Sequence, residues 1–126
     1  RPVETTDPDA VQRFETMPER PAWARSDDIW APSVSRFGGK YVMYFAAKRY
    51  DPPDSVNQEC VGRAVGSSPT GPFVADPEPL TCGLGGIHGA LDPSVVRDRT
   101  TGRAYLLVAF GGTSTPLWSI PLTSSG

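Results

Sequence analysis

The chain has 126 residues, of which 38% are hydrophobic and 21% are charged, a composition that suits a folded domain rather than a disordered segment. Its net charge of −2 and isoelectric point near 5.3 exclude a general electrostatic attraction to nucleic acid or to an anionic membrane. The longest apolar run, Tyr41 to Ala47, is far shorter than the roughly 20 residues that a transmembrane helix needs.

The first predicted unit is a β-meander. Ser35 to Ala47 is typical of strand, turn and strand, with Phe37 to Lys40 as the glycine-containing turn. Cys60 to Val65 adds a further strand, which ends in the turn residues Ser67 to Gly71. The unit therefore has three or four antiparallel strands.

The second predicted unit repeats this plan. Val96 to Ala109 again indicates strand, turn and strand, with Asp98 to Gly102 as the turn, and Leu117 to Leu122 follows as a third strand. Helical periodicity is weak, and 14 prolines with 13 glycines interrupt helix interiors throughout the chain. The sequence therefore predicts an all-β fold.

A near-repeat links the two units. Trp30 to Val34, read Trp-Ala-Pro-Ser-Val, recurs as Leu91 to Val95, read Leu-Asp-Pro-Ser-Val. Repeats at a fixed spacing of this size are typical of stacked sheet units. The copies differ chemically where the first has Ala31 and the second has Asp92, so this position is the natural place to look for function.

The two cysteines, Cys60 and Cys82, flank the connection rich in proline and glycine that leaves the first unit. In an exported protein a disulfide here would stabilise the fold by roughly 3 kcal/mol in the chain-entropy model. The alternative is two unpaired, small apolar residues, and the spacing leaves both readings open.

Five segments, taken in order and spacing, resemble the family 43 glycoside hydrolases over most of the chain from about Ala22 onward. The segments are Trp23-Ala24, Ile29 to Val34, Gly39 to Phe45, Gly62 to Phe73 and Leu91 to Asp98.

This resemblance implies about two blades of a five-bladed β-propeller, and thus an incomplete one. Residues 1–80 would form the end of the first blade region with its outer strands, and residues 81–126 the second blade region. It further implies an inverting hydrolase of arabinose- and xylose-containing polysaccharides, expected to be extracellular. Pro32 and Pro93, at equivalent positions of the repeat, lie 61 residues apart. At this spacing five blades would need roughly 300 residues.

The family uses three carboxylates on successive blades, and the resemblance places one of them at Asp92. That aspartate would raise the pKa of the general acid and orient it, because a charged carboxylate disfavours ionisation of a second carboxyl nearby. The alternative is that Asp92 caps a turn ahead of Pro93. We favour the catalytic role, since the repeat singles out the same position.

The other two carboxylates have no matching context in this sequence. Asp7 and Asp9 are the only upstream candidates for the base, but no apolar strand follows them, and we expect Thr5 to Met17 to be the outer part of a blade. The general acid would lie beyond Gly126. Glu59 and Glu78 are expected to be loop charges. The chain alone is therefore expected to be inactive.

Substrate-binding candidates are Trp30 and His88. Trp30 either stacks on a sugar ring or packs between blades, and His88 lies in a glycine-rich loop before Asp92, where it binds substrate or is a bystander. Asp27 and Asp28 either contact sugar hydroxyls or form a solvated turn. Phe45 and Phe110 are expected in the core.

No cofactor and no metal site are expected, because no His, Cys or carboxylate cluster has ligand spacing; calcium held by carbonyls or by isolated carboxylates stays compatible with the sequence. The expected partner is a carbohydrate substrate, with self-association through open blade edges. The alternative function is a non-catalytic carbohydrate-binding or scaffold module.

Overall fold

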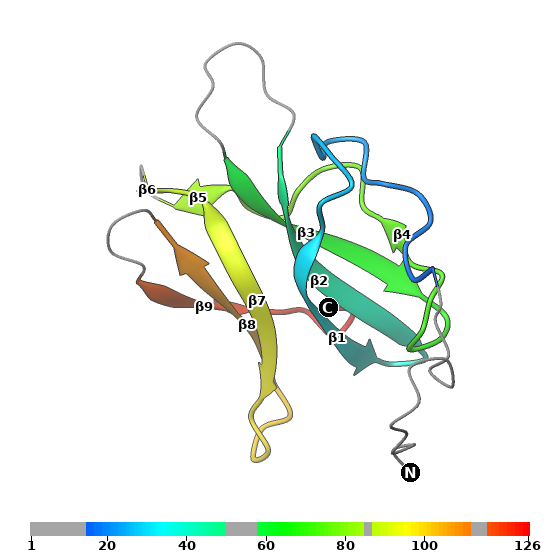
Figure 1. Ribbon diagram of the computed structural model, residues 1–126. Helices are drawn as coiled ribbons and strands as arrows, with labels where there is room; N and C mark the ends of the chain where they lie inside the picture. The colour runs from blue at the N-terminus through cyan, green and yellow to red at the C-terminus, as the bar shows by residue number, and fades with distance from the viewer. Residues whose placement is uncertain (1–14, 50–57, 85–86, 112–115) are drawn as a thin grey trace, which may run out of the picture.

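The structure is a computed structural model that describes residues 15–49, 58–84, 87–111 and 116–126. In this part of the chain all regular structure is β-strand, arranged in antiparallel sheets (Figure 1). The predicted all-β class is therefore confirmed. No helix among these residues is long and apolar enough to cross a membrane.

The first sheet is a four-stranded meander in the order β1-β2-β3-β4. Its strands are β1 Trp30–Phe37, β2 Lys40–Lys48, β3 Glu59–Gly66 and β4 Val74–Ala75. Gly38, at a φ of 60°, makes the predicted turn between β1 and β2. The hairpin and the third strand are confirmed, and β4 completes the sheet.

The second large sheet is a three-stranded meander in the order β7-β8-β9. Its strands are β7 Ala90–Arg97, β8 Ala104–Phe110 and β9 Leu117–Pro121. In the segment of the sequence that connects the two large sheets, β5 Gly83–Leu84 pairs with β6 Ile87–His88. The segment before Asp92 was expected to be a plain loop, and this part of the expectation is wrong, since its backbone forms a short ladder.

Strand β2 is buried on both faces, which explains why its sequence does not alternate. Successive side chains of a strand point to opposite faces. Val42 and Tyr44 enter one apolar cluster, whereas Met43 and Phe45 enter another on the opposite face. A continuous apolar run is what two-sided burial requires.

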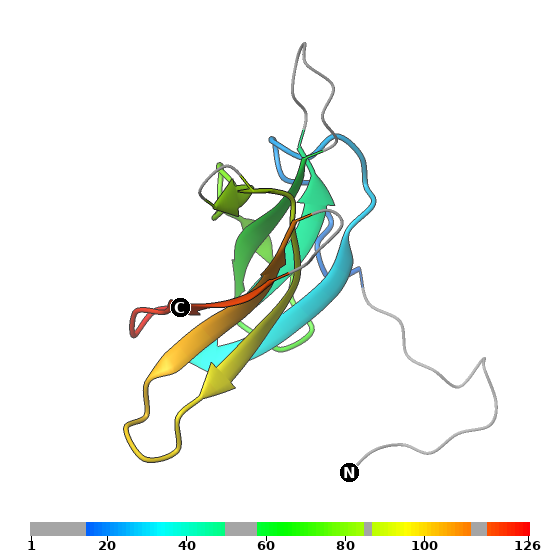
Figure 2. The ribbon, with the colours of Figure 1, turned by 90° about the vertical axis from the view of Figure 1, so that its left-hand side faces the viewer.

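The first of these clusters joins the two large sheets. Its buried members are Phe37, Val42, Tyr44, Val61, Ala90, Ala104, Leu106, Val108 and Phe110. The packing brings β7 against β1, and in Figure 2 the two strands run in the same direction toward the lower left. Phe110 and, in the second cluster, Phe45 are fully buried, as predicted.

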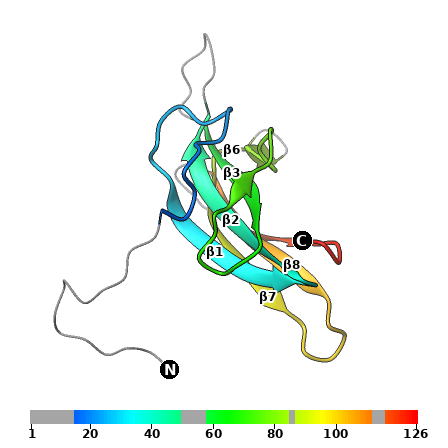
Figure 3. The same ribbon diagram turned by 90° about the vertical axis from the view of Figure 1, so that its right-hand side faces the viewer.

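The second cluster lies on the other face of the first sheet. The chain before β1 crosses this face (Figure 3), and Trp23 stacks on Phe45 with ring centroids 5.9 Å apart. Phe73 and Cys60 are buried in the same cluster. The first sheet therefore lies between two apolar layers.

A disulfide joins Cys60 in β3 to Cys82, which decides between the two readings that the sequence left open. Two backbone hydrogen bonds lie beside the disulfide. Leu80 N donates to Val61 O at 2.8 Å, and Val61 N donates to Thr81 O at 2.8 Å. The disulfide and these bonds fasten the connection between the two large sheets to β3.

Arg63 in β3 ties the end of the chain to the first sheet. Its guanidinium donates to the Asp76 carboxylate at 2.9 Å and to the carbonyl oxygen of Ser125 at 3.1 Å. The nearby Tyr44 is fully buried, and this burial raises the pKa of its hydroxyl. The turn after β9 is thereby held against β3.

Gly62 is a position where only hydrogen fits. A Cβ atom added there would lie 2.5 Å from Phe45 Cζ and 2.5 Å from Trp23 Cζ2, both in buried rings. Overpacking of this kind costs about 1–3 kcal/mol or more. We predict that Gly62→Ala lowers the free energy of unfolding by at least about 2 kcal/mol in urea denaturation.

The matched control is Gly39→Ala, because nothing lies within 4 Å of a Cβ added at that position. We expect a change within about 0.5 kcal/mol for this exposed turn. Equal stability of the two variants would contradict the stacking of Trp23 and Phe45 beside Gly62.

Candidate active site

The repeated segments form the same irregularity in both sheets. A β-bulge interrupts the pairing of β1 with β2 between Trp30 and Ser33, and another interrupts β7 with β8 between Leu91 and Ser94. Bulges bend a strand and re-aim side chains, and they are common beside active sites. The sequence repeat is therefore a structural repeat.

Each bulge contains one non-glycine residue with positive φ. Ala31 has a φ of 48° and Asp92 a φ of 53°. Aspartate tolerates this conformation better than alanine, because its short polar side chain can compensate locally. Strained positions of this kind cluster at functional sites, so the backbone marks the same two positions as the sequence does.

The two bulges lie at the same end of neighbouring strands. β1 and β7 pack side by side, and their far ends meet, where the Arg97 guanidinium lies over the Phe37 ring at 4.4 Å. Both strands start at the opposite end, in the upper half of Figure 2. Asp92 therefore occupies the strand end that corresponds to Ala31, on the strand that packs against the one containing Trp30.

The carboxylate of Asp92 is exposed. Within the described part of the chain it makes no hydrogen bond and no ion pair, whereas the adjacent Pro93 is buried. A carboxylate held on a fixed backbone without an internal partner can act on a neighbouring group. The catalytic role of Asp92 stays a prediction.

Trp30 is half-buried at the start of β1, where its backbone pairs with Ala46. This partial burial is compatible with either alternative for this residue. His88 pairs through its backbone with Gly83, and its side chain lies outside the described residues. Both binding roles stay predictions.

Glu59 was expected to be a loop charge, and this expectation is wrong. It is the first residue of β3, is half-buried and pairs with Lys48. Its carboxylate lies 3.3 Å from the position that a Cβ of Gly89 would take, at the end of the sheets where β7 begins. Only the pairing of β3 brings it there, so no local pattern indicated it. Glu78 lies exposed in a bend, as expected.

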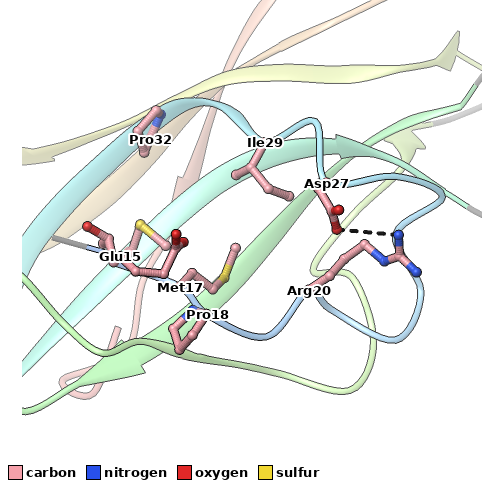
Figure 4. Close-up of a pocket in the computed structure, with 9 residues that line it drawn as sticks. Glu15, Met17, Pro18, Arg20, Asp27, Ile29 and Pro32 are labelled. Carbon is pink, nitrogen blue, oxygen red and sulfur yellow. Dashed lines mark hydrogen bonds and ion pairs between the residues drawn. The ribbon is translucent and has the colours of Figure 1, made fainter. Parts of the chain in front are cut away.

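A hollow of about 550 Å³ lies beside the β1 bulge (Figure 4). Met17, Ile29, Pro32 and Met43 give it an apolar floor, and Asp27 stands at its rim. The pocket is large enough for a small ligand.

The two aspartates before β1 behave as turn residues. Asp27 forms an ion pair with Arg20 at 3.4 Å, and Asp28 accepts a hydrogen bond from Ser26 Oγ at 3.0 Å. Both are exposed. This geometry agrees with the solvated turn, and the sugar contact stays a prediction.

Within the described ranges, no group of three or more His, Cys, Asp or Glu residues is arranged to hold a metal ion. The two upstream candidates for a base, Asp7 and Asp9, lie outside those ranges. Among the expected catalytic carboxylates, only Asp92 therefore has a described position.

The profile described as Glycosyl hydrolases family 43 matches residues 9–124. This chain belongs to family 43 of the glycosyl hydrolases. The matched range contains both bulges and every described strand. The family-43 chain is thus a partial propeller domain, which confirms the expected fold.

A curated relative supports the same assignment. The chain is 36% identical over 111 residues to "Xylosidase/arabinosidase 43A" of Humicola insolens. The alignment covers 88% of this chain and 28% of that protein. The family-43 chain therefore spans little more than a quarter of the relative's length.

Solved structures share the fold. The GH43_1 enzyme from Xanthomonas citri in complex with xylotriose is 36% identical, with a TM-score of 0.55 and coverage of 75% of this chain and 24% of that one. An endo-arabinase from Bacteroides thetaiotaomicron has a TM-score of 0.60 at 21% identity, covering 75% and 31%. The second likeness concerns the fold alone.

The bulge geometry predicts different responses at the two equivalent positions. Ala31 is exposed at positive φ, so Ala31→Asn should raise the free energy of unfolding by about 0.5–1 kcal/mol, because asparagine tolerates this conformation. Asp92→Asn preserves that tolerance and should change stability by less than about 0.5 kcal/mol. Urea denaturation measures both.

Asp92→Ala is the companion variant, because it places in the second sheet an alanine at positive φ, as Ala31 is in the first sheet. We expect it to cost about 1 kcal/mol relative to Asp92→Asn. A destabilising Ala31→Asn would contradict the positive φ at this bulge.

Proposed function

We propose that this chain is part of an inverting glycoside hydrolase that cleaves arabinose- or xylose-containing saccharides. The observation that carries the proposal is the position of Asp92, in a bulge at the start of β7, on the strand that packs against β1 with its equivalent bulge. Membership of family 43 supports the reaction class, and the relative named a xylosidase/arabinosidase supports the sugars.

Asp92 would act on a second carboxyl rather than on the sugar. Its negative charge would keep a neighbouring general acid protonated, so that this acid can donate its proton to the leaving oxygen. In an inverting enzyme the acid and the base stand roughly 6.5–9.5 Å apart, which leaves room for the attacking water. The matched residues of this chain supply Asp92 but neither the acid nor the base.

Trp30 would bind a sugar ring at the same end. It is half-buried at the start of β1, where an aromatic face can stack on the apolar face of a pyranose or furanose. Asp92 and Trp30 lie on neighbouring strands of different sheets. The site would therefore depend on the packing of the two sheets.

A chimera tests this function. Residues 15–126 replace the matching segment of the Xanthomonas citri enzyme, and release of 4-nitrophenol from aryl xylosides and arabinofuranosides measures activity. We predict that Asp92→Asn lowers kcat by about 100-fold or more, because asparagine preserves the backbone and removes the charge. The control is Glu78→Gln, an exposed carboxylate that should leave kcat unchanged.

An active chimera whose kcat survives Asp92→Asn would overturn the catalytic role. The 126-residue chain alone should give no turnover, since it supplies only one of the required carboxylates. Titration of this chain with xylotriose distinguishes the hydrolase from the alternative function, a non-catalytic carbohydrate-binding module. Binding that survives Asp92→Ala and is lost in Trp30→Ala would favour a non-catalytic carbohydrate-binding module.

We also propose that the chain works in an oxidising compartment outside the cytosol. The Cys60–Cys82 disulfide supports this location, because such bonds persist in exported proteins and are rare in the cytosol.

We further propose that the chain self-associates through the open edge of the second sheet, at β9, together with the apolar outer face beside that edge. Val96 and Leu117 on this face are 45% and 66% exposed, and Leu107 and Tyr105 lie half-buried between them. Exposed apolar sheet faces and edges favour association with another chain.

Sedimentation velocity over a wide concentration range tests this association. Leu117→Lys should shift the chain toward monomer, because it places a charge in the apolar face. Val74→Lys is the control, since Val74 is 73% exposed on β4 of the other sheet. A monomer at every concentration would contradict the proposal.

A further inference from the structure

Three arginines converge on a hollow at the end of the molecule opposite Asp92. The hollow measures about 290 Å³, and Arg36, Arg97 and Arg103 line it. Arg36 and Arg97 come from the ends of β1 and β7, and Arg103 from the turn before β8. Figure 2 shows these strand ends and the turn toward the lower left, away from the strand starts.

Two of the guanidinium groups are held in place by neutral partners. Arg97 lies over the Phe37 ring at 4.4 Å and donates from Nη2 to the carbonyl oxygen of Arg36. Arg36 donates from Nε to the carbonyl oxygen of Gly38 at 3.2 Å. Because a guanidinium has five N–H donors, most donors of both groups stay available.

The positive charge at this hollow is not neutralised from within. No carboxylate in the described part of the chain forms an ion pair with these three arginines. The nearest acidic residue in sequence, Asp98, accepts instead from Thr101 Oγ1 at 2.6 Å and from Thr100 N at 2.8 Å. Those bonds lower the pKa of Asp98, so its charge persists as a partial counterweight.

The chain as a whole is slightly acidic, with a net charge of −2, so a general excess of basic residues does not explain the arginine cluster. Hydroxyl groups of Thr101, Thr123 and Ser124 complete the polar lining. Guanidinium forks match the geometry of carboxylate and phosphate oxygens, and they are the donors of this pocket, because the Thr101 hydroxyl already donates to Asp98. The volume lies near the lower limit of ligand pockets, which suits a single charged group or one sugar unit.

We propose that this arginine pocket binds an oxyanion. Two sources share the required chemistry: the carboxylate of a uronic acid unit in an acidic saccharide, and free inorganic phosphate. The uronate source rests on the proposed carbohydrate function, whereas the oxyanion site itself does not. A uronate bound here would hold an acidic polysaccharide at the end of the folded molecule that is remote from Asp92.

Heteronuclear NMR titration of the 126-residue chain tests the pocket with three probes: glucuronate, inorganic phosphate and neutral glucose. We expect the anions, but not glucose, to shift the amide signals of Gly38, Gly102 and Thr123. Added salt should weaken the binding, because the guanidinium groups are exposed. Glucuronate binding alone would identify an acidic saccharide, and phosphate binding alone would identify a free anion.

Arg103→Gln is the principal variant, because the guanidinium of Arg103 forms no hydrogen bond or ion pair with the described residues. It should raise the dissociation constant about tenfold, the effect of one lost hydrogen bond to a charged group. Arg36→Gln should act similarly. The matched control is Arg99→Gln, which removes a charge from the same turn without lining the hollow.

Equal weakening by Arg99→Gln and Arg103→Gln would overturn the pocket in favour of general surface charge. Unchanged affinity in both Arg36→Gln and Arg103→Gln would overturn it as well, as would the absence of anion-specific shifts. Asp92→Asn should leave anion binding unchanged. Failure of the catalytic proposal and failure of this one are therefore distinguishable.

Discussion

The apolar core between the two large sheets is the interaction on which the other features depend. Val42, Val61, Leu106, Val108 and Phe110 are each almost completely excluded from solvent there. Burial of such a side chain contributes about 1.5–3 kcal/mol, so the combined effect exceeds any single polar contact in the chain. This core seats β7 against β1, and it thereby places the two bulges at one end and the arginines at the other.

The two ends have opposite chemical character. At one end, Asp92 presents an exposed carboxylate on a left-handed backbone at the start of β7, and it has no partner among the described residues. At the other, Arg36 and Arg97 present cations that are anchored by a carbonyl and by Phe37. The same strand pair, β1 and β7, determines the geometry of each.

Local patterns predicted the six long strands, though not β4, β5 and β6, because glycine turns between apolar runs have few alternative structures. They did not predict the bulges. A residue before proline is normally steered to extended backbone, yet Ala31 and Asp92 precede prolines at positive φ, so tertiary packing overrides that preference. Glu59 and the arginines were missed for a different reason: sheet pairing brings them to their sites from distant positions, which no short sequence window records.

The most direct test of the account is a methyl NOE experiment on the chain with labelled valine and leucine side chains. The account predicts cross-peaks between methyl groups of the first sheet, on Val42 and Val61, and methyl groups of the second, on Leu106 and Val108. Cross-peaks confined to residues within each sheet would contradict the shared core. Asp92 would then have no fixed position relative to Trp30, and both proposed sites would lose their structural basis.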